Sequence, residues 1–305
     1  MPSAVVFGYH NVGARCLRVL LAHGLEVPLV VTHEDSPSES IWFDSVADIA
    51  RLHGLETATP ADPNDGAIAA RLAALRPDYL FSFYYRHMLG PELLASASRG
   101  AFNMHGSILP KYRGRVPVNW AIIRGERATG ATLHEMVAKP DAGRIVDQQS
   151  VPILPNDTAH DVFVKVTVAA ELVLDRALPG LVAGTTVMRD QDLGSGSYFG
   201  GRKPEDGRID WTRDAWEIHN LIRAVAPPYP GAFTTIAGRH ARILSTHWRG
   251  VNVPIKERPA LYVNADRLFI RCFDGGVLEL LALELDGEPV ENAELRKRFS
   301  AEIPL

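Results

Sequence analysis

The sequence predicts an α/β domain followed by a small all-β domain. Three apolar runs, at residues 4–8, 27–32 and 79–83, are typical of buried strands, and helical patterns separate them. After Pro227 the pattern changes to short β-rich segments with turn residues between them. A chain of 305 residues is long enough for two domains, each with its own core.

The first part of the chain alternates strands with helices. The strand at residues 4–8 precedes a helical pattern that reaches Leu21, and Gly24 is suited to end that helix. Helical patterns at residues 41–53 and 71–75 lie between the second and third strands. Because this alternation is typical of βαβ units, we expect a parallel sheet with helices on both faces.

The pattern changes after the third strand. Residues 101–103 predict the end of a strand, and residues 105–114 are rich in Gly, Pro and polar side chains, which indicates a loop. Pro117 is suited to begin a short helix. Residues 129–137 and 145–153 predict two more strands.

A long helix and a linker complete the first domain. Thr158 can cap a helix that ends near Leu178, ahead of Pro179. Residues 186–207 are polar and glycine-rich, which predicts a surface linker. We place the domain boundary there, with the first domain at residues 1–204 and the second at residues 205–305.

The second domain is predicted to be a small barrel. A helix at residues 215–225 precedes about five short strands, and residues 291–299 predict a closing helix. The strands are predicted at residues 232–236, 241–248, 260–263, 268–273 and 277–285.

The composition is that of a soluble globular protein, with 46% apolar residues, 22% charged residues and a net charge of -4. No apolar run is long enough to cross a bilayer, and the first residues do not form a signal peptide. We therefore expect a cytoplasmic protein without membrane insertion. Cys16 and Cys272 lie far apart in apolar surroundings, which predicts buried free thiols.

Several familiar motifs are incomplete. Residues 8–13 follow a strand and precede a helix, but their spacing fits neither a dinucleotide fingerprint nor a phosphate loop. His134-Glu135 lacks the second histidine that a zinc helix would carry four residues after the first. With two cysteines and scattered histidines, we expect no metal site.

The residues most suited to catalysis are Asn103 and His105. Two residues apart on a strand, they point to the same face. An amide can stabilise an oxyanion and an imidazole can move protons, as acyl transfer to an amine requires. Asp141, in a turn between two strands, can reach the His105 ring, orient it and raise its pKa. Asn-x-His alone also fits a buried amide bonded to backbone beside a surface histidine.

These residues belong to a longer signature. Asn103-x-His105, then Ser-Ile-Leu-Pro-Lys-Tyr-Arg-Gly, and Asp141-Ala-Gly resemble the 10-formyltetrahydrofolate-dependent formyltransferases. The resemblance extends over the chain and includes residues 81–87, 199–202 and 218–233. It is closest to the formyltransferase domain of the bifunctional polymyxin-resistance proteins, which acts on UDP-4-amino-4-deoxy-L-arabinose. Their decarboxylating dehydrogenase half is absent, so a separate dehydrogenase chain is a candidate partner.

The resemblance implies a Rossmann-like formyltransferase domain with a small C-terminal OB-like domain. It also implies that Asn103 stabilises the transition state, His105 transfers the proton and Asp141 raises the pKa of His105. The implied contacts to 10-formyltetrahydrofolate are His87, Met88, Leu89, Arg115, Val137, Ala138, Lys139, Pro140 and Asp141.

The acceptor contacts are less clearly marked. Lys111 and Arg113, together with Arg115, form a basic loop that can meet a pyrophosphate, or that can be solvated. Tyr9 and His10 follow the first strand, at the edge where open α/β sheets bind ligands, or they pack against the loop.

Members of the family formylate methionyl-tRNA, nucleotide-linked amino sugars or glycinamide ribonucleotide. A tRNA enzyme needs positive surface. Residues 33–40 contain three acidic side chains and no Lys or Arg, and residues 206–305 contain 13 basic and 14 acidic ones. We therefore expect a nucleotide-linked amino sugar, with methionyl-tRNA as the alternative. A non-catalytic binding protein and a formylfolate hydrolase are the other classes considered.

Overall fold

The computed structural model describes residues 1–37, 41–255, 258–265, 267–290 and 302–305. The chain forms two compact units, each built from three segments. The first unit comprises Met1–Pro117, Thr129–Val151 and Val164–Gly200. The second comprises Val118–Ala128, Pro152–Phe163 and Gly201–Leu305.

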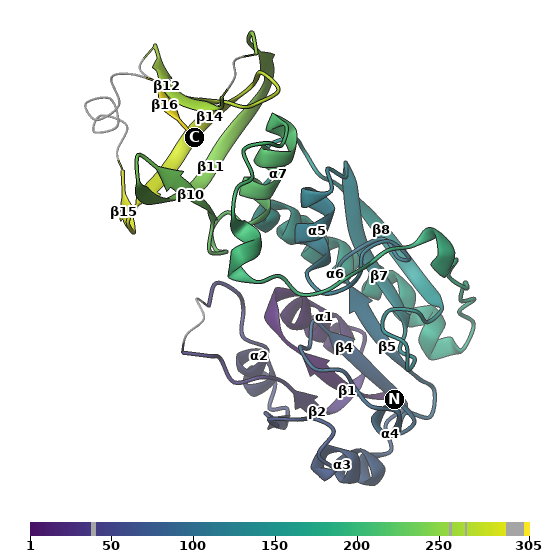
Figure 1. Cartoon of the computed structure of the whole chain (residues 1–305). Helices are drawn as coiled ribbons and strands as arrows, with labels where there is room; N and C mark the ends of the chain where they lie inside the picture. The colour runs from purple at the N-terminus through teal and green to yellow at the C-terminus, as the bar shows by residue number, and fades with distance from the viewer. Residues whose placement is uncertain (38–40, 256–257, 266, 291–301) are drawn as a thin grey trace. The chain divides into compact units, whose positions relative to one another are not determined.

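The first unit contains a seven-stranded sheet with the order β3-β2-β1-β4-β5-β7-β8 (Figure 1). Strands β1 to β5 pair in parallel, as expected, but β7 runs antiparallel to β5, so the sheet is mixed. The strands are β1 (Ser3–Gly8), β2 (Glu26–Val31), β3 (Thr57–Ala58), β4 (Tyr79–Phe83), β5 (Gly100–His105), β7 (Ala128–Glu135) and β8 (Ile145–Pro152).

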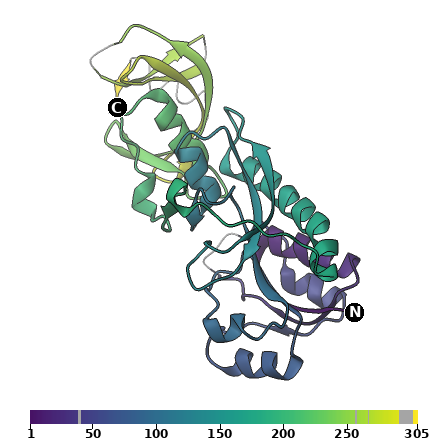
Figure 2. The same cartoon turned by 90° about the vertical axis from the view of Figure 1, so that its right-hand side faces the viewer.

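Helices cover both faces of this sheet (Figure 2). They are α1 (His10–Ala22), α2 (Val46–Leu52), α3 (Ala67–Leu75), α4 (Pro91–Leu94) and α6 (Ala159–Ala183). Val5 and Phe7 of β1 share one core with Ile68 and Leu72 of α3. Because side chains alternate along a strand, Val6 faces the opposite side. The alternation predicted these helices on both faces, and the Rossmann-like architecture is the one that the resemblance implied.

Helix α2 is shorter than the predicted helix at residues 41–53. It begins at Val46 because the Ser45 hydroxyl accepts the backbone N–H of Asp48, at 3.1 Å, as an N-cap does. The aromatic residues ahead of it, Trp42 and Phe43, lie outside the helix and contact the His10 ring. Their apolar character resembles a helix face, but they cover His10 instead.

Helix α6 is longer than predicted, since it continues through Pro179 to Ala183. A proline inside a helix removes one hydrogen bond. Leu178 and Leu181 are buried, and the Leu181 carbonyl accepts the Tyr79 hydroxyl at 2.8 Å. The burial and the bonded carbonyl stabilise a last turn that the sequence pattern does not predict.

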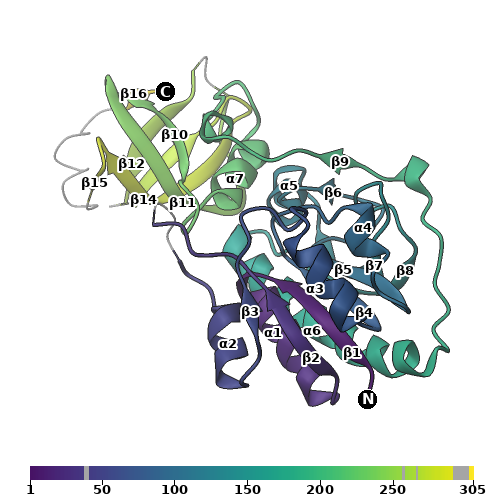
Figure 3. The same ribbon diagram turned by 90° about the horizontal axis from the view of Figure 1, so that it is seen from below.

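The second unit contains a curled antiparallel sheet with the order β10-β11-β14-β13-β12-β16, which forms an OB-like half-barrel (Figure 3). Ile218 and Ile222 of α7 belong to its apolar core. The predicted closing helix at residues 291–299 lies outside the described residues. The elements are α5 (Pro117–Ile123), α7 (Ala215–Ala224), β10 (Ala232–Ile236), β11 (Arg239–Asn252), β12 (Ala260–Asn264), β13 (Arg267–Arg271), β14 (Gly276–Leu285), β15 (Glu288–Pro289) and β16 (Ile303–Pro304).

Helix α7 carries a buried polar network within the second unit. His219 is fully buried, with Nδ1 at 2.8 Å from the Thr246 hydroxyl and Nε2 at 3.0 Å from the Pro155 carbonyl. Arg223 donates to the carbonyls of Leu154 and Asp157. The segment Pro152–Phe163 therefore satisfies polar groups of α7.

Both cysteines are buried and free. In the part of the chain that the structure describes, no helix combines the length and the apolar character needed to cross a membrane.

Candidate active site

Asn103 and His105 lie at the carboxyl end of β5, and β7 supplies the residues opposite them. In the antiparallel register Asn103 pairs with His134 and His105 pairs with Thr132. The four positions alternate with apolar residues such as Met104 and Leu133, which are buried on the other face. The register thus gathers four polar side chains on one face of the sheet.

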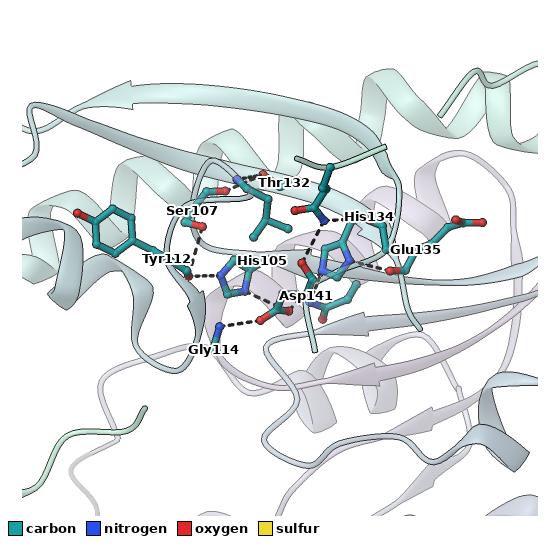
Figure 4. A network of polar contacts seen from close by, with 12 residues as sticks. His105, Ser107, Tyr112, Gly114, Thr132, His134, Glu135 and Asp141 are labelled. Atoms are coloured by element: carbon teal, nitrogen blue, oxygen red, sulfur yellow. Dashed lines mark hydrogen bonds and ion pairs between the residues drawn. The ribbon is translucent and has the colours of Figure 1, made fainter. Parts of the chain in front are cut away.

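The loop after β5 closes back on His105 (Figure 4). The Thr132 hydroxyl donates to the Ser107 carbonyl at 2.6 Å, and the Ser107 hydroxyl donates to the Lys111 carbonyl at 2.6 Å. These bonds bring the Tyr112 carbonyl to 2.7 Å from Nε2 of His105. An oxygen without a proton can only accept, so Nε2 of His105 carries the proton of this bond.

Asp141 lies between two histidines. One carboxylate oxygen, Oδ1, lies 3.5 Å from Nδ1 of His105 and 3.5 Å from Nε2 of His134. The other, Oδ2, accepts the backbone N–H of Gly114 at 2.8 Å. The structure therefore brings Asp141 to His105, as the sequence predicted.

Burial and charge act in opposite directions on this pair. Burial alone would raise the pKa of Asp141, but His105 and the Gly114 N–H hold that pKa well below its usual range. For His105, burial lowers the pKa below its ordinary value, although Asp141 and the Tyr112 carbonyl act to raise it. Asp141 thus acts to raise the pKa of His105, as expected, but the desolvation of the buried ring has the larger effect, so the net pKa is lowered.

His134 is a member of the site that sequence reasoning missed. Its Nε2 lies 3.1 Å from Nδ2 of Asn103, and its Nδ1 lies 2.7 Å from the Glu135 carbonyl. In the sequence, His134 stands out only as part of an incomplete zinc motif. The signal that would have found it is the alternation of Thr132 and His134 with buried apolar residues along a strand.

Parts of the predicted surface linker, residues 186–207, form hydrogen bonds with this site. Within it, β9 (Tyr198–Phe199) pairs in parallel with β6 (Arg113–Gly114), and the Ser197 hydroxyl accepts the Tyr112 N–H at 2.8 Å. Gln191 donates to the carbonyls of Asp141 and Gly143, at 3.0 Å and 2.6 Å. Sequence reasoning missed Gln191 and Ser197 as well, because their partners are dozens of residues away.

Gly114 is held where only glycine fits. Its φ is +97°, and a Cβ would lie 2.1 Å from the Phe199 carbonyl. This close approach of β6 to β9 aims the Gly114 N–H at Asp141.

The residues predicted to contact folate lie on segments that follow β4 and β7. His87 and Met88 are exposed and Leu89 is buried, while Arg115 is exposed in the loop after β6. Val137, Ala138 and Lys139 are exposed, and Pro140 and Asp141 are partly buried. The second segment leads directly to the carboxylate of Asp141, which faces His105.

The predicted acceptor residues differ in setting. Tyr9 is buried, and its hydroxyl donates to Asp35 at 2.7 Å. His10 stacks on Phe43, with 3.9 Å between the ring centres. Lys111 is exposed, whereas Arg113 is buried and its Nε has no hydrogen-bond partner among the described residues.

Tyr9 and His10 stand at the point where the strand order of the sheet reverses. The chain proceeds from β1 to β2 and β3 on one side, and then returns to β4 and β5 on the other. Ligands of open α/β sheets bind at the carboxyl ends of strands at such a point. No group of three or more His, Cys, Asp or Glu side chains that could hold a metal is found among the described residues.

Comparison with known families agrees with this fold. Residues 5–178 match the formyl transferase family, and residues 202–298 match the formyl transferase C-terminal domain. The chain belongs to the formyltransferase family and is a formyltransferase.

Three solved structures of N-formyltransferases have a similar fold. The N-formyltransferase of Helicobacter canadensis, solved with folinic acid and dTDP-3-aminofucose, is 22% identical, with a TM-score of 0.75 over 92% of this chain and 99% of that one. WlaRD, a sugar 3N-formyltransferase solved with dTDP and 5-N-formyl-THF, is 20% identical, with a TM-score of 0.70 over 94% and 99%. A 4-N formyltransferase of Francisella tularensis is 19% identical, with a TM-score of 0.61 over 76% and 91%.

Proposed function

We propose that this formyltransferase moves the formyl group of 10-formyltetrahydrofolate to the amine of a nucleotide-linked amino sugar. The observation that carries the proposal is the grouping of Asn103, His105 and Asp141 at the end of β5. An amide donor, a neutral imidazole and a carboxylate are together what acyl transfer to an amine needs.

Asn103 is proposed to stabilise the oxyanion. When the amine attacks the formyl carbon, negative charge develops on the formyl oxygen. The amide nitrogen of Asn103 has two hydrogens, and one is engaged with His134. The other is left to donate to the oxygen as its charge grows.

His105 is proposed to carry the proton. Because its Nε2–H is bonded to the Tyr112 carbonyl, the basic nitrogen of the neutral ring is Nδ1. Its lowered pKa leaves the ring neutral near pH 7 and able to accept the amine proton. The imidazolium then lies 3.5 Å from Asp141, which stabilises it until the proton passes to the folate nitrogen that loses the formyl group.

The substrate contacts are proposed from the resemblance and from where these segments lie in the sheet. The segments containing His87, Met88 and Leu89, and Val137 to Asp141, together with Arg115, are proposed to bind the folate. Tyr9, His10, Lys111 and Arg113 are proposed to bind the sugar nucleotide, since Tyr9 and His10 follow β1 where the strand order reverses.

The acceptor is proposed to be UDP-4-amino-4-deoxy-L-arabinose. With this acceptor the proposed role of the enzyme is lipid A modification and polymyxin resistance, and its proposed location is the cytoplasm. The resemblance to polymyxin-resistance proteins and the lack of basic excess at residues 206–305 support this choice. A separate decarboxylating dehydrogenase chain is the proposed partner, and it would act earlier in the pathway that makes the amino sugar. The proposed catalytic domain is residues 1–204, with an OB-like domain at residues 205–305.

A competition experiment tests the acceptor. The protein is incubated with 10-formyltetrahydrofolate and equal amounts of UDP-4-amino-4-deoxy-L-arabinose, a dTDP-linked 3-amino sugar and methionyl-tRNA. Mass spectrometry then identifies the formylated product. Formylation of the UDP-sugar is expected. Formylation of the dTDP-sugar alone would overturn the choice of nucleotide sugar, and formylation of the tRNA alone would overturn the substrate class.

A further inference from the structure

The two nitrogens of the His134 ring have different neighbours, and these neighbours decide which nitrogen donates a hydrogen bond and which accepts one. The ring is buried, and Nδ1 lies 2.7 Å from the Glu135 carbonyl, which can only accept. Nδ1 therefore carries the proton. Nε2 faces the side-chain amide nitrogen of Asn103 at 3.1 Å, and an amide nitrogen can only donate. In the neutral ring Nε2 is therefore the acceptor.

This arrangement decides how the Asn103 amide is turned. The two ends of a carboxamide have nearly the same shape, so packing alone does not distinguish nitrogen from oxygen. A bare Nε2 repels the amide oxygen and accepts the amide nitrogen. Asp141 Oδ1 lies 3.5 Å from the same Nε2, beyond the usual hydrogen-bond length, so it does not replace Asn103 as a partner.

We propose that His134 is a positioning residue that holds the Asn103 amide with its nitrogen fixed in the site, so that the second N–H is directed for the formyl oxygen. The proposal rests on the proposed function, in which Asn103 meets that oxygen. His134 itself touches no reacting atom. Its effect passes through Asn103, and a test has to show that dependence.

The kinetic test uses His134→Leu, which keeps an apolar volume but offers no acceptor. Without the bond the amide turns between two orientations, and we expect kcat to fall about three- to tenfold, the range that one hydrogen bond supplies. KM values for both substrates are expected to stay within about twofold. His134→Gln places an amide oxygen near the position of Nε2 and is expected to restore most of kcat. His53→Leu, at an exposed position after α2, is the control.

A double-mutant comparison separates positioning from general structural damage. In the Asn103→Ala background, His134→Leu is expected to change the remaining rate by less than about twofold, because the residue through which it acts is gone. The same three- to tenfold loss in both backgrounds would overturn the proposal. If His134→Leu does not fold, the smaller His134→Ala, which also offers no acceptor, is compared in the two backgrounds instead.

A second readout needs no acceptor. In ¹⁵N-labelled protein, the ring nitrogens of His134 are expected to show the tautomer with the proton on Nδ1. The Asn103 side-chain amide signal, identified by its loss in Asn103→Ala, is expected to move in His134→Leu. A proton on Nε2 would overturn the proposal. Because this measurement involves no substrate, it stands even if the choice of acceptor proves wrong.

Discussion

Two buried histidines, one in each unit, have similar surroundings but different chemistry. His105 ends β5 and His219 lies on α7, and each is almost fully enclosed and contacts a backbone carbonyl through Nε2. Burial lowers the pKa of both rings. They differ at Nδ1, which faces the Asp141 carboxylate in His105 and the Thr246 hydroxyl in His219.

That difference separates a ring that can exchange a proton from one that cannot. The hydroxyl of Thr246 satisfies a neutral His219 but gives no compensation for a positive charge. A carboxylate 3.5 Å from Nδ1 stabilises the imidazolium of His105. Burial alone therefore does not distinguish the two rings, whereas the group that faces Nδ1, a carboxylate in one and a hydroxyl in the other, does.

Replacing each histidine by alanine gives the largest expected contrast. His105→Ala removes the proton carrier, and we expect kcat to fall by about 10²–10⁴. The melting temperature is expected to change less than in His219→Ala, which leaves the Thr246 hydroxyl and the Pro155 carbonyl of a buried network without their partner. Normal turnover in folded His105→Ala would contradict the proposed role, and a large loss of kcat in folded His219→Ala would contradict the contrast.

Asp141→Asn makes His105 resemble His219. The neutral amide no longer stabilises the imidazolium, so we expect kcat to fall by about 10², within the range of acid–base catalysis. The matched control is Asp175→Asn at a surface pair, where Asp175 lies 2.7 Å from His23. Steady-state kinetics of the two variants provide the test. Equal activities would show that the carboxylate at Asp141 has no chemical role.

The sequence predicted the placement of His105 and Asp141 better than the bonds that hold them. Asn103 and His105 are two residues apart on a strand, so local geometry fixes their common face. Asp141 was predicted from its place in a turn between two strands, and the family signature added its role. The pairing of Asn103 with His134 depends on the register between β5 and β7, and no short-range pattern fixes that register.

The fold shows the same division. The early strands were predicted closely because buried parallel strands are continuous apolar runs, as in β4 (Tyr79–Phe83). Helix ends were predicted less well, since a local cap at Ser45 and tertiary contacts of Leu181 decided them. Strand β7 was predicted at residues 129–137, but its antiparallel direction was not, because the alternation of elements does not reveal strand direction.

The pH dependence of the free energy of unfolding tests the lowered pKa of His219. The folded pKa of His219 is about 4, below the unfolded value of about 6.5, so the folded state binds fewer protons between these values. Its contribution is fully present above pH 6.5 and is lost as the pH falls toward 4, by up to about 3 kcal/mol. Urea unfolding of wild type and of His219→Gln, at about pH 4.5 to 7.5, measures this loss of stability over most of the range between the two pKa values. A parallel pH dependence in both proteins would contradict this assignment.

The smallest expected effect concerns the linker that supports Asp141. Gln191→Met keeps the length of the side chain but removes the two bonds to the Asp141 and Gly143 carbonyls. Since each net hydrogen bond contributes about 1 kcal/mol, we expect kcat to fall by no more than about tenfold, with Asp141 less firmly held. Gln149→Met on β8, whose amide bonds only the neighbouring Ser150 carbonyl among its own donors, is the control. A loss as large as that of Asp141→Asn would mean that the linker takes a direct part in catalysis, whereas no loss would mean that Gly114 alone fixes the carboxylate that distinguishes His105 from His219.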